Sequence, residues 1–144
     1  MKRRTFLLKS ASTAFGFQVV SSHVLRAAEG QNTPNNKIRI AAIGCGGRGG
    51  ADLGAMAGED IVALCDVDDR RAAGSFKKFP KAKRFKDFRK MYDAVGDQID
   101  AVLVATPDHT HAVAIMGAIG RGKHVYSEKP LAHSVAEVRT LRAA

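Results

Sequence analysis

Three glycines, Gly44, Gly46 and Gly49, carry the clearest chemical signal in the sequence, because their spacing is typical of a turn that receives phosphates. The first permits a tight turn, the second lets a phosphate approach a backbone without a Cβ, and the third lets a following helix pack closely. The first N–H groups of that helix can bind an anion. A flexible linker is the alternative, but a linker needs no flanking strand and helix patterns. The spacing therefore predicts a pyrophosphate-binding turn.

An acidic residue follows at the expected distance. Asp66 ends the apolar run "DIVALCD" and lies 17 residues after Gly49. A carboxylate at this place accepts hydrogen bonds from the hydroxyls of an adenosine ribose and repels a 2′-phosphate. We therefore expect NAD as the cofactor and expect NADP to bind less well, although a neighbouring Arg70 or Arg71 would weaken this preference.

Short apolar runs alternate with helical patterns along the rest of the chain. Strands are predicted over residues 37–44, 60–68, 81–85, 100–107 and 123–130. Helices are predicted after the glycine turn and over residues 68–79, 87–96, 109–122 and 134–143, the last beginning with a Ser134–Glu137 capping box. This order predicts an α/β fold with a doubly wound parallel sheet, Rossmann-like, whose ligands bind at the carboxyl ends of the strands. Gly44, Asp66, Thr106 and residues 127–130 would all lie there.

Four motifs in order, "GCGGRG", "CDVD", "ATPDHTH" and "EKP", resemble the N-terminal NAD(P)-binding domain of the Gfo/Idh/MocA oxidoreductases. The resemblance covers nearly all of the chain after about Lys37. It implies hydride transfer between NAD(P) and a sugar, inositol or related polyol. It also implies a catalytic Lys129, with a cis peptide bond before Pro130. The cofactor-binding residues that it implies are Gly44, Gly46, Gly47, Arg48, Gly49, Asp66, Thr106, Pro107, His111 and Glu128.

The same resemblance implies a second, substrate-binding domain that is absent from this chain, and relatives that are homo-oligomers at full length. We therefore expect a dinucleotide-binding domain over residues 37–144 that is truncated at its C-terminus. An NAD-dependent glycoside hydrolase of the same family and a non-catalytic nucleotide-binding module are the alternative functions. Whether this chain alone is an enzyme stays open at this point.

Other groups that could do chemistry are weaker candidates. Asp108, His109 and His111 form one local cluster without further ligands, so we predict no metal site. Cys45 and Cys65 are too few for a disulfide framework and are expected to be small buried hydrophobic residues near each other.

The first thirty residues have the pattern of an export signal. Arg3, Arg4, Thr5, Phe6 and Leu7 resemble the twin-arginine motif, and a modestly apolar stretch follows them. We expect residues 1–30 to be a signal with the start of a linker, the protein to be periplasmic or otherwise exported, and no stable membrane anchor to remain after signal removal. An attached amphipathic helix is the alternative.

The formal net charge is +9, and the densest basic segment spans residues 77–90. A nucleic-acid patch is one interpretation of this segment. A solvated face is favoured, because Phe76, Phe79, Phe85 and Phe88 are spaced as core anchors. We therefore predict no nucleic acid as a partner; the resemblance implies a small-molecule sugar or polyol.

Overall fold

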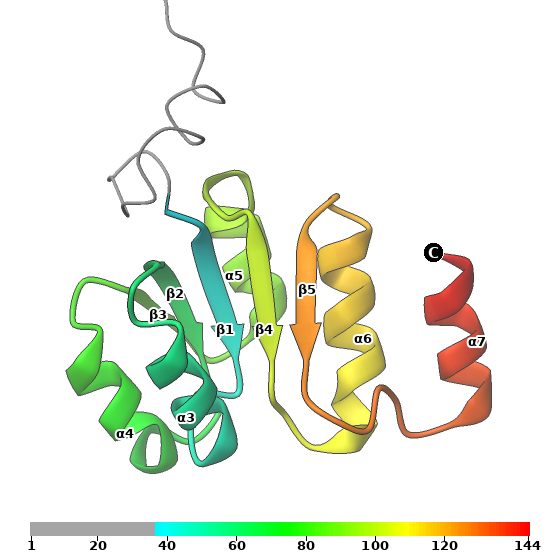
Figure 1. Cartoon of the computed structure of the whole chain (residues 1–144), viewed down its shortest axis with the longest axis horizontal. Coiled ribbons are helices and arrows are strands. Elements are labelled where there is room, and N and C mark those ends of the chain that lie inside the picture. The colour runs from blue at the N-terminus through cyan, green and yellow to red at the C-terminus, as the bar shows by residue number, and fades with distance from the viewer. Residues whose placement is uncertain (1–36) are drawn as a thin grey trace, which may run out of the picture. The chain divides into compact units, whose positions relative to one another are not determined.

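The computed structural model describes residues 37–144, so the predicted export signal and most of the linker lie outside the described residues. These residues form a five-stranded sheet with the strand order β3-β2-β1-β4-β5, and every neighbouring pair is parallel (Figure 1). The strands are β1 (Arg39–Ile43), β2 (Asp60–Cys65), β3 (Lys83–Phe85), β4 (Ala101–Val104) and β5 (His124–Ser127). The helices are α3 (Arg48–Ala55), α4 (Asp69–Lys78), α5 (Phe88–Val95), the 3-10 helix η2 (Gly96–Gln98), α6 (Asp108–Ile119) and α7 (Val135–Ala143).

The strand order creates one reversal in the middle of the sheet. The chain runs outward from β1 through β2 to β3, then returns to place β4 on the other side of β1 and β5 beyond it. The connections that follow β1 and β4 therefore leave the sheet in opposite directions, which opens a crevice at the carboxyl ends of these two strands. The predicted doubly wound α/β fold is confirmed, with strands that are shorter than their apolar runs.

Helices cover both faces of the sheet. Ile40 and Ala42 of β1 belong to a buried cluster with Leu53 of α3 and Phe76 of α4. The intervening residues of β1 face the other way and belong to a second cluster with buried residues of α5 and α6. This alternation explains why the central strand is apolar from Ile40 to Ile43. None of the helices within residues 37–144 is long and apolar enough to cross a membrane.

Local signals in the sequence place the helix starts. Asp68 accepts a hydrogen bond from the Arg70 N–H at the start of α4, and Asp87 accepts one from the Arg89 N–H at the start of α5, both at 2.9 Å. At α7 the predicted capping box is present, with both reciprocal bonds between Ser134 and its glutamate.

The predicted anchoring of the basic segment is confirmed. Phe76 is buried, Phe79 packs against the same cluster, and Phe85 and Phe88 pack against the cluster on the other face. The lysines of this segment are exposed: Lys77, Lys78, Lys81, Lys83, Lys86 and Lys90. The segment is thus a solvated face held by its aromatic residues.

The two cysteines are buried and unbonded to each other. The Cys45 Sγ lies 3.5 Å from the carbonyl oxygen of Cys65. Burial raises the pKa of both thiols to about 12, so both stay protonated near neutral pH. The prediction of small buried residues near each other is confirmed.

An ion pair joins β1 to β4 at the edge of the sheet opposite the crevice. The guanidinium of Arg39 lies 2.7 Å from one carboxylate oxygen of Asp100, and the other oxygen accepts the Arg39 N–H at 3.0 Å. These hydrogen bonds lower the pKa of Asp100 from its ordinary value of 3.8 to about 2. Both side chains are more than a third exposed, so solvent screens much of this interaction.

We expect Asp100→Asn to change the acid sensitivity of the fold. A carboxyl group with a lowered folded-state pKa stabilises the fold above its ordinary pKa, and this stabilisation is lost as the pH falls towards 2. The variant should therefore lose less free energy of unfolding than the wild type between pH 4 and pH 2, measured by urea unfolding. Asp97→Asn is the control, because Asp97 is exposed and forms no ion pair within residues 37–144. Identical acid sensitivity of wild type and Asp100→Asn would contradict the assignment.

Candidate functional site

The glycine turn begins directly after β1, next to the residues that follow β4. Gly44 has a φ of +83°, a conformation that L side chains rarely adopt. Its N–H donates to the Cys65 carbonyl at 2.8 Å. A Cβ on Gly44 would lie 2.5 Å from the carbonyl oxygen of Ala105. The predicted tight turn is therefore present, and it brings the backbones that follow β1 and β4 close together.

Two further glycines allow close packing around this turn. A Cβ on Gly49 would overlap the carbonyl oxygen of Gly44, so only glycine lets the first turn of α3 approach β1 so closely. A Cβ on Gly46 would lie 2.8 Å from the carbonyl oxygen of Arg71, at the start of α4. Glycine at position 46 thus has a packing reason in addition to the predicted approach of a phosphate. Gly47, with a φ of +54°, immediately precedes α3.

Asp66 lies at the end of β2 and is bonded to the backbone on both sides. One carboxylate oxygen accepts the Cys45 N–H at 2.8 Å and the other accepts the Asp68 N–H at 2.9 Å. A carboxylate has about four acceptor sites, so these two bonds leave room for ligand hydroxyls. Asp66 therefore fixes the glycine turn and can still accept hydrogen bonds from a ribose.

A cavity of about 690 Å³ lies over the carboxyl ends of β1, β2 and β4. Six of the predicted site residues line it: Gly44, Gly46, Arg48, Asp66, Thr106 and Pro107. Its size is within the range of small-molecule and cofactor pockets. The Thr106 hydroxyl is buried and has no hydrogen-bond partner among residues 37–144, as expected of a group that bonds to a ligand. The cradle and the donor set thus fit a dinucleotide.

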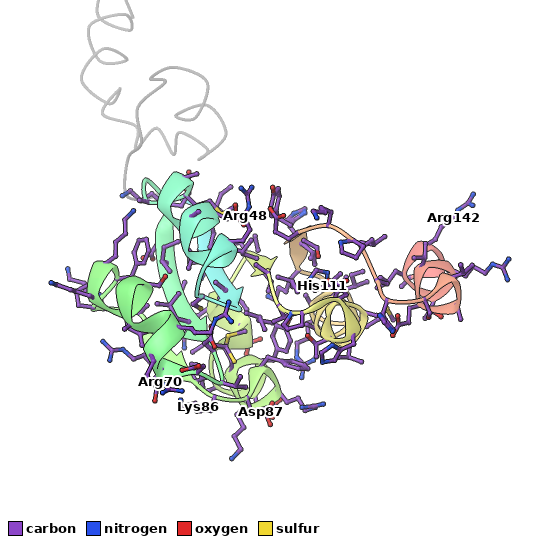
Figure 2. The ribbon with its side chains drawn as sticks, turned by 90° about the horizontal axis from the view of Figure 1, so that it is seen from below. Arg48, Arg70, Lys86, Asp87, His111 and Arg142 are labelled. Atoms are coloured by element: carbon purple, nitrogen blue, oxygen red, sulfur yellow. The ribbon has the colours of Figure 1, made fainter. Side chains whose placement is uncertain are left out.

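An arginine links the glycine turn to the loop after β5. The side chain of Arg48, which is labelled in Figure 2, lies 3.1 Å from Glu128 and 3.0 Å from Asp52, one helical turn along α3. Burial raises the pKa of Asp52, and the positive charge of Arg48 opposes this effect. Glu128 is therefore held close to the turn, although no atom of this residue lines the cavity.

Lys129 follows Glu128 and is exposed. Its side chain forms no ion pair within residues 37–144. The peptide bond between Lys129 and Pro130 is cis, as the resemblance implies. The Lys129 amine is thus exposed and unpaired within the described residues, and its catalytic role stays a prediction.

His111, in the first turn of α6, is fully buried (Figure 2). Its Nε2 lies 2.6 Å from the carbonyl oxygen of Thr106, and its Nδ1 lies 2.7 Å from that of Pro130. The ring therefore connects the segments that follow β4 and β5 instead of lining the cavity, and its contact with a cofactor stays a prediction. Residues 37–144 contain no group of three or more His, Cys, Asp or Glu side chains that could hold a metal ion.

Ten further residues line the cavity and were not among the predicted site residues, although either Arg70 or Arg71 was expected near Asp66. They are Ile43, Cys65, Val67, Asp68, Arg71, Lys86, Phe88, Ala105, His109 and Thr110. Arg71 and Arg70 are adjacent in sequence, but only Arg71 lines the cavity, whereas the Arg70 side chain is 94% exposed. The signal that could have separated them is the Asp68 cap, because the rotation of α4 follows from where the helix begins.

An open parallel sheet with a glycine turn, a following helix and an acidic residue at its reversal defines a dinucleotide-binding domain of the Rossmann class. Residues 38–144 match the Gfo/Idh/MocA family, described as an oxidoreductase family with an NAD-binding Rossmann fold. The chain belongs to this family, and NAD is the cofactor of the domain.

Individual relatives agree with this assignment. The chain is 34% identical over 110 residues to an inositol 2-dehydrogenase of Rubrobacter xylanophilus, covering 73% of this chain and 30% of that protein. It is 35% identical over 116 residues to a glycosyl hydrolase family 109 protein of Solibacter usitatus, covering 72% and 26%. Among solved structures, the scyllo-inositol dehydrogenase of Lactobacillus casei with bound NAD(H) and scyllo-inositol matches with a TM-score of 0.68 at 26% identity, covering 75% and 32%. The chain thus spans about a third or less of the length of these relatives.

We expect Gly49→Ala to destabilise the domain by roughly 1–3 kcal/mol, the usual cost of overpacking, because the new Cβ collides with backbone. The matched control is Gly74→Ala in α4, where a Cβ meets nothing within 4 Å. That substitution should stabilise the helix by about 0.5–1 kcal/mol. Urea unfolding of both variants measures the difference. If Gly49→Ala had the same unfolding free energy as the wild type, the close approach of α3 to β1 would not be essential for stability.

Proposed function

We propose that this chain is the cofactor-binding part of an NAD-dependent oxidoreductase that acts on a sugar, inositol or related polyol by hydride transfer. The observation that carries the proposal is that the glycine turn, Asp66 and the loop bearing Lys129 follow strands β1, β2 and β5 of the same parallel sheet. The inositol dehydrogenases among the relatives support the substrate class.

Each site residue has a distinct task in this proposal. The backbone N–H groups at the start of α3 bind the pyrophosphate, and the Asp66 carboxylate accepts the adenosine ribose hydroxyls. The Thr106 hydroxyl, buried without a partner among the described residues, bonds to the bound cofactor. Glu128, held by Arg48, lies on the nicotinamide side. His111 positions Thr106 and Pro130 through their carbonyl groups.

NAD, when bound, accepts a hydride from the carbinol carbon of the substrate. The Lys129 ammonium lies next to the substrate hydroxyl in this proposal, where its positive charge stabilises the alkoxide that develops as the hydroxyl proton leaves to water. Its exposure and its lack of an ion pair within residues 37–144 support this role, because a lysine engaged by a carboxylate would be less available.

Binding of NAD and NADP tests the cofactor site directly. We expect the 144-residue chain to bind NAD more tightly than NADP in isothermal titration calorimetry. Asp66→Asn should lower the affinity for NAD by about tenfold and shift the ratio towards NADP, because a charged acceptor that repels a 2′-phosphate is lost. The variant should also be less stable, since its amide replaces one of the two oxygens that hold the backbone.

Asp97→Asn, in η2 at the opposite edge of the sheet, is the control for this measurement and should leave both affinities unchanged. An unchanged ratio of NAD to NADP affinity in Asp66→Asn would remove the ribose role from Asp66.

An NAD-dependent glycoside hydrolase is the second candidate, supported by the similarity to the glycosyl hydrolase family 109 protein. Product analysis separates the two, using the longest protein encoded in this reading frame. Net accumulation of NADH with a polyol indicates the dehydrogenase. Release of a sugar from a glycoside without net NADH indicates the hydrolase. Binding of NAD without turnover of either substrate class would favour a nucleotide-binding module.

We propose in addition that the protein is exported through a twin-arginine route to the periplasm. The support is the pattern Arg3-Arg4-Thr5-Phe6-Leu7 and the modest hydropathy of the residues after it. This route carries folded proteins, so the cofactor can be bound before export.

A fusion of residues 1–36 to a reporter protein tests the route. Replacing Arg3 and Arg4 together by lysine should abolish export, measured as reporter activity in the periplasmic fraction. Arg26→Lys, in the same segment but outside the motif, should have no effect. Export of the double variant at the wild-type level would exclude a twin-arginine signal.

A further inference from the structure

Arg71 lies against the glycine turn although it belongs to a different helix. It is the third residue of α4, and its side chain lines the cavity. Its Cβ lies 3.0 Å from where a Cβ on Gly46 would be, and its Nη2 lies 3.6 Å from where a Cβ on Gly47 would be. The side chain therefore runs along the turn from Gly46 to Gly47 and ends next to the start of α3.

The charges around the cavity distinguish Arg71 from the other cations there. Arg48 is engaged by Asp52 and Glu128, and Lys86 lies 2.7 Å from Asp69. Arg71 forms no ion pair with any residue in the range 37–144. The cation without a carboxylate partner among these described residues is thus the one that lies on the phosphate-binding turn.

We propose that Arg71 donates hydrogen bonds to the pyrophosphate of the bound dinucleotide. The proposal rests on the NAD-binding function proposed above. A guanidinium suits this task, because its planar set of donors matches phosphate oxygens and is weakly hydrated. The N–H groups at the start of α3 contact the pyrophosphate from one side, and Arg71 contacts it from the side of α4.

Two other groups of a dinucleotide could lie near an arginine at this place: the adenine ring and the 2′-phosphate of NADP. The 2′-hydroxyl side of the ribose is expected at Asp66, whereas the end of the Arg71 side chain lies at Gly47. Gly47 immediately precedes the first N–H groups of α3, where a pyrophosphate binds. The position of Nη2 therefore favours the pyrophosphate over both alternatives.

The test is calorimetric titration of the full chain with NAD, NADP, ADP and adenosine. We expect Arg71→Ala to weaken NAD, NADP and ADP by a similar factor of about ten, the loss typical of one charge-assisted hydrogen bond, and to leave adenosine unchanged. Arg71→Lys should recover part of the affinity, because it keeps the charge. Arg70→Ala is the matched control, since this neighbouring side chain is 94% exposed and pairs with Asp68 at 3.7 Å.

Each other outcome overturns the proposal in a recognisable way. Unchanged affinity for NAD in Arg71→Ala removes Arg71 from the site. An equal loss for adenosine indicates contact with the adenine ring, and a larger loss for NADP than for NAD indicates contact with the 2′-phosphate. If the wild-type chain is folded by circular dichroism and binds no dinucleotide, the proposed function fails and this inference fails with it.

Discussion

The contact between Gly49 and the carbonyl oxygen of Gly44 is the constraint on which the rest of the site depends. No side chain fits between the first turn of α3 and the end of β1. Because α3 approaches so closely, its first residue, Arg48, lines the cavity together with Gly44 and Gly46. The position of the Arg48 side chain, and through it that of Glu128, follows from the same approach.

The site is assembled from segments that are distant in sequence and parallel in space. Parallel strands bring their carboxyl ends to one edge, so residues from the ends of β1, β2, β4 and β5 meet without any special connection. Backbone atoms do much of the positioning: the Asp66 carboxylate is bonded to two N–H groups, and the His111 ring lies between two carbonyl groups. Such bonds depend on the fold more than on the identity of the bonded residues.

Much of the fold could be predicted because its signals are local. Apolar runs, the glycine spacing and the Ser134–Glu137 capping box each fall within a few residues, and all of them correspond to elements of the structure. Four of the five strands end earlier than predicted, since an apolar run does not show where hydrogen bonding between strands stops. The predicted strand over residues 123–130 thus ends at Ser127.

The contacts within the site were less predictable, because they depend on packing between distant elements. The sequence by itself did not separate Arg70 from Arg71, since their directions depend on the rotation of α4 against the sheet, and only the Asp68 cap pointed to that rotation. It could not show that Gly46 lies against the backbone of α4, or that both nitrogens of His111 face carbonyl oxygens. The contact of Gly46 with Arg71 joins residues 25 apart in sequence, and that of His111 with Pro130 joins residues 19 apart.

The His111 ring has one more consequence. Carbonyl oxygens only accept hydrogen bonds, and a neutral imidazole carries a single N–H. A neutral ring therefore bonds Thr106 or Pro130 at any one time, and only a ring with two protons bonds both. The tautomer with the proton on Nε2 donates to the Thr106 carbonyl, and the tautomer with the proton on Nδ1 donates to the Pro130 carbonyl, next to Lys129. The position of a single proton inside the protein thus decides which of the two segments receives the hydrogen bond.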